Sequence, residues 1–171
     1  MEHIRKVFLD ASALLTWLLY PDIDEAIKLG GKLLSEYLKR PTRQPYSNEP
    51  CLTEFLARLK WMRHYKEISD NGYFLRIELL KAMINHHTLH ISKFNYWENK
   101  YIDKALHLVR KSQAKIDFID ALQIVDVLEG PFKFFSGPSV TLLITTDKKL
   151  RDVAREEGVE VWCPIDEITP D

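Results

Sequence analysis

Short strand-like runs alternate with helical stretches along this chain, and this alternation constrains the fold more than any other feature of the sequence. A helix between two strands carries the chain back across the sheet, so the two strands pair in parallel. The helices then cover the faces of the sheet. We therefore expect an α/β protein with a three-layer α/β/α fold and a central, mostly parallel sheet of four to five strands.

The sequence pattern predicts strands at residues 4–10, 88–92, 140–146 and 159–164. It predicts helices at residues 11–21, 22–40, 51–68, 73–87, 95–112, 115–129 and 147–158. Residues 40–50, RPTRQPYSNEP, contain three prolines and few apolar side chains, so we predict a loop there. A chain of 171 residues suits one domain, 1–171, in which residues 41–90 form a mainly helical region.

The composition excludes a disordered or a fibrous chain. Hydrophobic residues make up 46% of the chain and charged residues 29%, a balance typical of globular domains. The net charge of −1 provides no overall basic field for nucleic acid, although a local basic groove is compatible with it. Cys51 and Cys163 form no disulfide framework, and no segment has the apolar length of a membrane span. We therefore expect a cytoplasmic protein without a membrane partner.

Two carboxylates directly follow predicted strands. Asp10 follows VFL in the first strand, and Asp147 follows LLITT in a later one. The carboxyl ends of parallel strands meet at one edge of a sheet, where α/β proteins bind their ligands. Each residue also has a structural interpretation, because an aspartate in this position caps the helix that follows it.

Three further acids lie on predicted helices. In KIDFIDALQIV, Asp117 and Asp120 are three residues apart, so they share one helix face among apolar neighbours. An acid among core residues is costly unless it is paired or binds a cation. In the alternative, Asp117 caps the helix and Asp120 is a first-turn residue stabilised by the helix dipole. Glu54 has its own alternative, an ion pair with Arg58 one helical turn later.

Together these carboxylates indicate a binding site for a hard divalent cation. No matching histidine or cysteine pattern accompanies them, and oxygen ligands select Mg²⁺ or Mn²⁺ over Zn²⁺. Such a site suits phosphodiester hydrolysis, because the cation polarises the phosphate, activates a bound water and neutralises the leaving oxygen. Basic side chains near the acids would contact the phosphates of the substrate, and we single out Arg58, Lys115 and Lys148.

The stretches VFLDASALL, LTEFLARL, DFIDALQIV and LLITTDKKL occur in this order, and the chain resembles the PIN-domain ribonucleases, most closely the VapC-like toxins of toxin–antitoxin pairs. The resemblance spans essentially the whole chain. It places the catalytic and metal-binding acids of that family at Asp10, Glu54, Asp120 and Asp147. It makes Asp117 a second-tier metal ligand or base, with supporting hydroxyls at Ser12 and Thr145. It also implies a Mg²⁺ or Mn²⁺ cofactor, an RNA substrate, a small antitoxin partner and a homodimer.

Three other functions stay open at this point. A PIN nuclease that processes RNA has no antitoxin, and a PIN-like scaffold binds RNA or protein without cutting it. A phosphatase similar to the haloacid dehalogenases also places an aspartate at a strand end. That chemistry requires a second acid two residues later, where this chain has Ser12.

Overall fold

The computed structural model describes residues 4–19, 25–131, 133 and 141–170. The described residues form five strands, which are β1 (Arg5–Leu9), β2 (Arg43–Asn48), β3 (His90–Ser92), β4 (Leu142–Ile144) and β5 (Glu160–Trp162). They also form seven helices, which are α1 (Ala11–Leu19), α2 (Glu25–Leu38), α3 (Glu49–His64), α4 (Asp70–Asn85), α5 (Asn99–Lys111), α6 (Phe118–Glu129) and α7 (Lys148–Glu156). The predicted start of the second helix, at residue 22, lies outside the described residues.

All five strands run parallel, in the order β3-β2-β1-β4-β5. β1 lies at the centre, where Phe8 is opposite Tyr46 of β2 on one side and Leu143 of β4 on the other. Each pair of neighbouring strands that is consecutive in the chain is joined through at least one helix. The prediction of a three-layer α/β/α fold with a parallel sheet is therefore confirmed.

The prediction of a loop over residues 40–50 is wrong, because most of this segment is β2, which lies between β1 and β3. Proline is a poor residue for a central strand, since it removes one backbone donor from the ladder. Here Pro45 is buried opposite Val7, and β2 still pairs with β1 over four residues. The pairing of the other β2 residues with β1 thus outweighs the loss of the one backbone N–H that Pro45 lacks.

Polar side chains of β2 are buried because they form hydrogen bonds with distant or following segments. The Ser47 hydroxyl donates to the Leu9 carbonyl of β1 at 2.7 Å. Asn48 is buried at the end of β2 and caps α3, where its side-chain oxygen accepts from the Cys51 N–H at 2.9 Å. The region 41–90 therefore contributes β2 and the first residue of β3 to the sheet as well as the helices α3 and α4.

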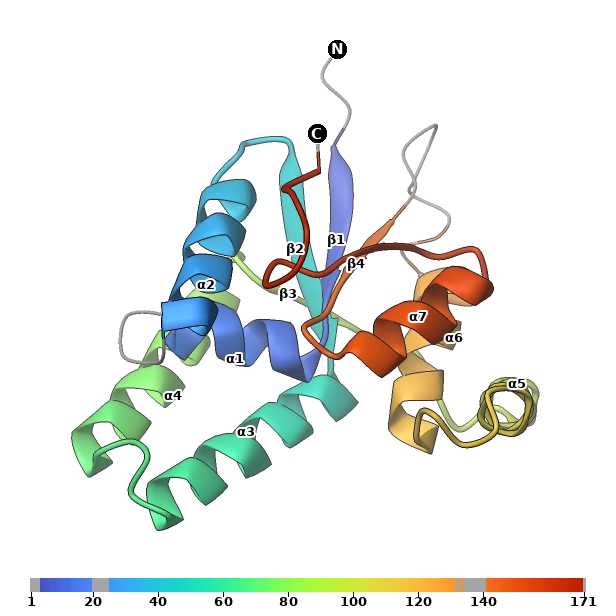
Figure 1. Cartoon of the computed structure of the whole chain (residues 1–171), viewed down its shortest axis with the longest axis horizontal. Helices are drawn as coiled ribbons and strands as arrows, with labels where there is room; N and C mark the ends of the chain where they lie inside the picture. The colour runs from blue at the N-terminus through green and yellow to red at the C-terminus, as the bar shows by residue number, and fades with distance from the viewer. Residues whose placement is uncertain (1–3, 20–24, 132, 134–140, 171) are drawn as a thin grey trace.

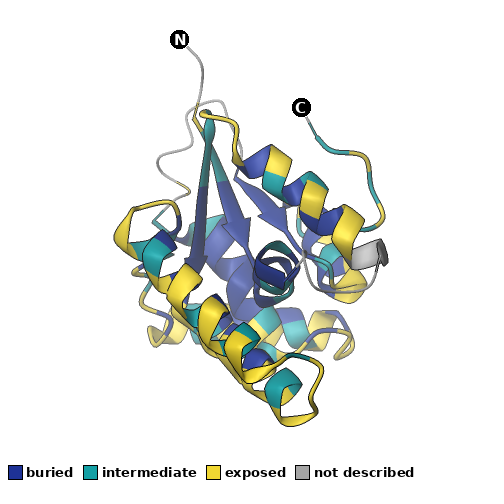
Figure 2. Cartoon of the chain, turned by 90° about the vertical axis from the view of Figure 1, so that its left-hand side faces the viewer, coloured by how far each residue is buried: buried dark blue, intermediate teal, exposed yellow. Residues whose placement is uncertain are grey.

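Alternation along β1 divides the core between the two faces of the sheet. Val7 and Leu9 pack with α1, α2, α3 and α4, whereas Phe8 packs with α5, α6 and α7. Figure 1 shows these two groups of helices on opposite sides of the sheet. Figure 2 shows buried strands between helices whose outer faces are exposed. Among the described residues, no helix is long and apolar enough to cross a membrane.

The carboxyl edge of the sheet is where several helices begin. Asp10 lies between β1 and α1, Asn48 caps α3, and Asp147 caps α7 after β4. In Figure 1 the N-terminal ends of α1, α3, α6 and α7 all lie around this edge. Helix N-termini carry unpaired N–H groups and a partial positive charge, both of which favour carboxylates. The fold therefore supports a group of acidic side chains at this edge.

Candidate active site

Asp10 is buried at the end of β1, with 3% of its surface exposed. Its Oδ1 accepts from the Ala13 N–H at 2.6 Å, as expected of a residue that caps α1. The Thr145 hydroxyl donates to Oδ2 at 2.6 Å, and the Ser12 hydroxyl lies 2.9 Å from both carboxylate oxygens. Burial raises the pKa of Asp10 to about 6; these hydrogen bonds oppose the rise, and the charge of Glu54 adds to it.

Ser12 and Thr145 join the ends of β1 and β4 around this carboxylate. The Ser12 Oγ accepts from the Thr146 N–H at 2.8 Å, and the Thr145 Oγ1 accepts from the Asp147 N–H at 2.9 Å. The two hydroxyl oxygens are 3.3 Å apart. Both hydroxyls thus lie beside Asp10, where they fix the orientation of its carboxylate.

Asp117 and Asp120 form a capping box at the start of α6. The Asp117 carboxylate accepts from the Asp120 N–H at 2.9 Å, and the Asp120 carboxylate accepts from the Asp117 N–H at 3.3 Å. The helix-capping interpretation is therefore correct for the exposed Asp117. Asp120 is less exposed, and burial raises its pKa to about 7, with further increases from the charges of Asp117, Asp147 and Glu54.

The charges of Glu54, on α3, and of Asp147, at the start of α7, raise the pKa of Asp120. Burial raises the pKa of the half-buried Glu54. The Arg58 guanidinium, 4.0 Å away, opposes the rise, whereas the charges of Asp117 and Asp147 add to it. Asp147 is exposed and caps α7 by accepting from two N–H groups of the first turn, at 2.7 and 3.2 Å. Its carboxylate therefore has a capping role, as the structural interpretation expected.

The charges of neighbouring acids add to the raised pKa values of Asp10, Glu54 and Asp120, and helix capping alone does not relieve that repulsion. A divalent cation does, and an oxygen-only set of donors fits Mg²⁺ or Mn²⁺. Mg²⁺ usually binds one or two carboxylates directly and keeps several waters. No group of three or more Asp, Glu, His or Cys side chains in the described part of the chain is arranged as a preformed metal site.

The three basic residues singled out in the sequence lie in different surroundings. Arg58 approaches the acids and pairs with Glu54. The Lys148 ammonium instead pairs with Asp166 of the C-terminal segment at 2.9 Å, and the charge of Lys115 acts on Asp152 of α7. Of the three, Arg58 is therefore the residue best placed to contact a phosphate at the acids.

Two cavities lie along α3, and each includes residues of the site. A cavity of about 630 Å³ lies between α3 and α6, with Glu54 and Asp117 in its wall. A second cavity, of about 320 Å³, lies between α1 and α3, with Ser12 and Arg58 in its wall. Volumes of this size are typical of sites that bind small molecules or nucleotides.

Sequence reasoning missed Asp126, a fully buried residue of α6. Its carboxylate accepts from the Tyr96 hydroxyl at 2.8 Å, the Asn48 amide at 3.0 Å and the Ser92 hydroxyl at 3.4 Å. These donors lie at the ends of β2 and β3 and in the segment before α5. Because Asn48 also caps α3, Asp126 ties α6 to the start of α3 and so positions the two helices that carry acids of the site. The sequence signal is a lone acid in the apolar run IVDVL.

We expect Asp126→Ala to lower the free energy of unfolding by about 2 kcal/mol, because buried donors lose their acceptor and a cavity opens. Urea denaturation followed by circular dichroism measures this change. Asp103→Ala removes an exposed carboxylate from α5 and is the matched control, with an expected change below about 0.5 kcal/mol. Equal stabilities of the two variants would show that the hydrogen bonds of Asp126 contribute little to holding α6.

Comparison with known proteins assigns no family to this chain. No protein-family model matches it, and no curated protein matches it at a significant level.

Proposed function

We propose that this protein is a divalent-metal-dependent endoribonuclease with a PIN-like fold. The observation that carries the proposal is the group formed by Asp10, Glu54 and Asp120, whose pKa values are raised by burial and by other acids of the same edge. A bound cation would stabilise such a group in its ionised form. The resemblance of four sequence stretches to PIN-domain ribonucleases supports the same function.

When bound, a Mg²⁺ or Mn²⁺ ion would supply Lewis-acid chemistry, that is, polarisation of the scissile phosphate and a lower pKa for a bound water. The ion would be held by carboxylates drawn from Asp10, Glu54, Asp120 and Asp147, with Asp117 as a second-tier ligand or base. Ser12 and Thr145 hold the Asp10 carboxylate in place, so little further ordering is needed when the ion binds. Arg58 would bind a phosphate of the RNA and offset the negative charge of the acids.

A cleavage assay tests this function. Purified protein is incubated with end-labelled single-stranded RNA in Mg²⁺, in Mn²⁺ or in EDTA, and internal cuts are expected only with a metal ion. RNA that stays intact at saturating metal, or that is cut equally in EDTA, would remove the proposal. RNA that is bound but never cut would identify the protein as a PIN-like binding scaffold.

The proposal extends to a toxin that acts in the cytoplasm and is neutralised by a small antitoxin, and this part is supported by the sequence resemblance. The antitoxin would cover the acidic edge and block access of RNA to it. A short neighbouring reading frame for a small DNA-binding protein is the observation that favours a toxin. A gene without such a neighbour favours an RNA-processing nuclease.

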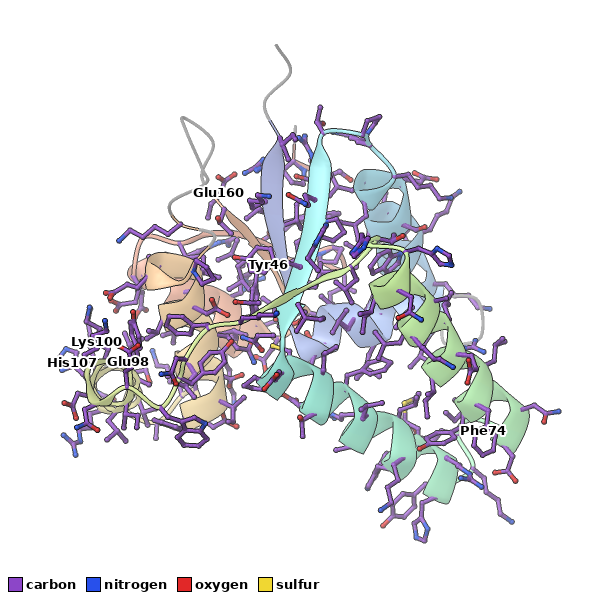
Figure 3. All side chains as sticks on the ribbon, turned by 180° about the vertical axis from the view of Figure 1, so that it is seen from behind. Tyr46, Phe74, Glu98, Lys100, His107 and Glu160 are labelled. Carbon is purple, nitrogen blue, oxygen red and sulfur yellow. The ribbon has the colours of Figure 1, made fainter. Side chains whose placement is uncertain are left out.

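We further propose a homodimer formed through the α3–α4 hairpin. Six large apolar side chains are exposed on these two helices and the turn between them, namely Leu56, Trp61, Tyr65, Phe74, Leu75 and Leu79. Figure 3 shows Phe74 near the outer end of the hairpin. A concentration of exposed large apolar side chains on one pair of helices favours an interface.

Leu75→Asp is expected to convert the dimer to a monomer, because it places a charge in the proposed apolar contact. Light scattering coupled to size-exclusion chromatography measures the mass in solution. Ile168→Asp changes another exposed apolar residue, in the C-terminal segment, and should leave the dimer intact. A wild-type protein that is monomeric at high concentration would contradict the proposed dimer.

A further inference from the structure

Trp97 is the most exposed tryptophan among the described residues, with 78% of its surface accessible. It lies between β3 and α5 and forms part of the wall of the cavity between α3 and α6. Within the described part of the chain, its indole stacks on no aromatic ring and donates no hydrogen bond. An isolated exposed tryptophan is ordinary, but this one borders a cavity that also contains Glu54 and Asp117 of the proposed active site.

The remaining wall of this cavity combines apolar and acidic side chains. Tyr96, Phe118 and Ile119 contribute apolar surface, and Glu49 and Thr53 contribute oxygen acceptors from the first turns of α3. No basic side chain is among the residues that line the cavity in the described part of the chain. The lining therefore disfavours a phosphate and suits a flat, neutral ring that carries hydrogen-bond donors.

We propose that this cavity binds one unpaired nucleobase of the RNA substrate, stacked on Trp97 and donating its exocyclic amino group to Glu49 or Thr53. The inference rests on the proposed function and deepens it, because the base would belong to a nucleotide whose phosphate meets the divalent cation proposed at Glu54 and the neighbouring acids, outside this cavity. Proteins recognise single-stranded RNA by stacking splayed bases on aromatic side chains. Carboxylates read the amino group of a base such as cytosine.

Binding of a base in this cavity requires two properties of the RNA. The RNA is single-stranded at the cleavage site, since a base inside a duplex cannot enter the cavity. The base in the cavity is adenine, cytosine or guanine in preference to uracil, because uracil has no exocyclic amino group and its one N–H on that edge lies between two carbonyl oxygens that the acidic wall repels. A basic peptide is the competing occupant, and its chemistry would pair lysine or arginine with the same carboxylates.

Binding of short fluorescent oligo(A), oligo(C) and oligo(U) RNA, measured by anisotropy, tests the inference. The titrations use the full chain in Ca²⁺, which also binds carboxylates, and the length of each oligonucleotide is checked on a gel afterwards. Trp97→Ala is expected to weaken binding of oligo(A) and oligo(C) by about 5- to 150-fold, the range for loss of one base–aromatic stack. Trp97→Phe should recover most of the affinity.

A second variant tests the contact with the amino group of the base, and a third is a control. Glu49→Ala is expected to reduce the ratio of the affinity for oligo(A) to the affinity for oligo(U), because the amino group of the base loses an acceptor. The contribution of stacking on Trp97 should be retained. Leu106→Ala removes an exposed apolar side chain from α5 and is the control that should bind as the wild type does. Because Trp97 is exposed, Trp97→Ala should melt at the same temperature as the wild type.

The possible failures are distinguishable from one another. If Trp97→Ala binds every oligonucleotide within twofold of the wild type while both proteins cut RNA, the nucleobase site is wrong and the proposed nuclease stands. Equal affinities for oligo(U) and oligo(A) overturn the amino-group contact. If Trp97→Ala loses binding of a lysine- and arginine-rich peptide but keeps binding of RNA, the cavity binds a protein partner instead of a base. A wild-type protein that neither binds nor cuts RNA removes both proposals.

Discussion

Asp10→Asn is expected to reduce metal-dependent RNA cleavage by about 10³-fold, equivalent to about 4 kcal/mol of transition-state stabilisation. The substitution removes the negative charge that Asp10 contributes to the cation site. It preserves shape, because an asparagine oxygen can still accept from the Ala13 N–H and its amide can donate to the Thr145 hydroxyl. The loss should therefore reflect metal binding and catalysis rather than unfolding.

The control for this experiment is Asp103→Asn, which changes an exposed carboxylate of α5 in the same way. Initial rates are compared at several Mn²⁺ concentrations, with thermal melting of each variant as a check on folding. Cleavage by Asp10→Asn at the wild-type rate, in a protein that folds normally, would contradict the assignment of Asp10 to the metal site.

Without metal, the acidic edge is expected to make the protein less stable as the pH rises from about 4 to about 7. The folded state holds protons on these acids at pH values where the unfolded chain has already lost them, so deprotonation favours unfolding. For the buried Asp10, a pKa raised from 3.8 to about 6 corresponds to roughly 3 kcal/mol of lost stability. Asp120 acts in the same direction, with a smaller effect because solvent partly reaches its carboxylate.

Urea denaturation in EDTA at pH 5 and pH 8 measures this effect. Other groups also titrate over this range, so the informative quantity is the difference between the wild type and Asp10→Asn at each pH. The wild type should lose about 1.4 kcal/mol more than Asp10→Asn between the two pH values, because the rest of the effect of Asp10 falls below pH 5, where the unfolded chain has already lost its proton. Parallel pH profiles for the two proteins would show that Asp10 is not held with a raised pKa. Added Mn²⁺ should restore stability at pH 8 in the wild type alone.

Much of the fold could be predicted because the relevant signals are local. Val7, Phe8 and Leu9 form an apolar run whose alternate side chains serve both faces of the sheet, and helical periodicity marks the elements that cover those faces. β2 could not be predicted in this way. Its buried segment contains Pro45 and Ser47, and their burial depends on pairing with β1, a strand about forty residues earlier in the chain.

The site was partly predictable for a similar reason. A parallel sheet brings its strand ends to one edge, so Asp10 and Asp147 could be placed together from the order of elements alone. Local sequence could not decide between helix capping and a shared acidic cluster, because both are present. Asp117 and Asp147 cap their helices, and their charges also raise the pKa of Glu54. Asp126 was missed because its partner Asn48 is 78 residues away in the sequence.

Calorimetric titration of Mn²⁺ into the metal-free protein asks whether the acids at the carboxyl edge bind a divalent cation. We expect saturable binding at pH 8, weaker binding at pH 5 where Asp10 and Asp120 are protonated, and strongly reduced binding by Asp10→Asn and by Asp120→Asn. Asp103→Asn should bind as the wild type does. The absence of saturable binding by the folded wild type, or unchanged binding by both site variants, would contradict a metal site at this edge.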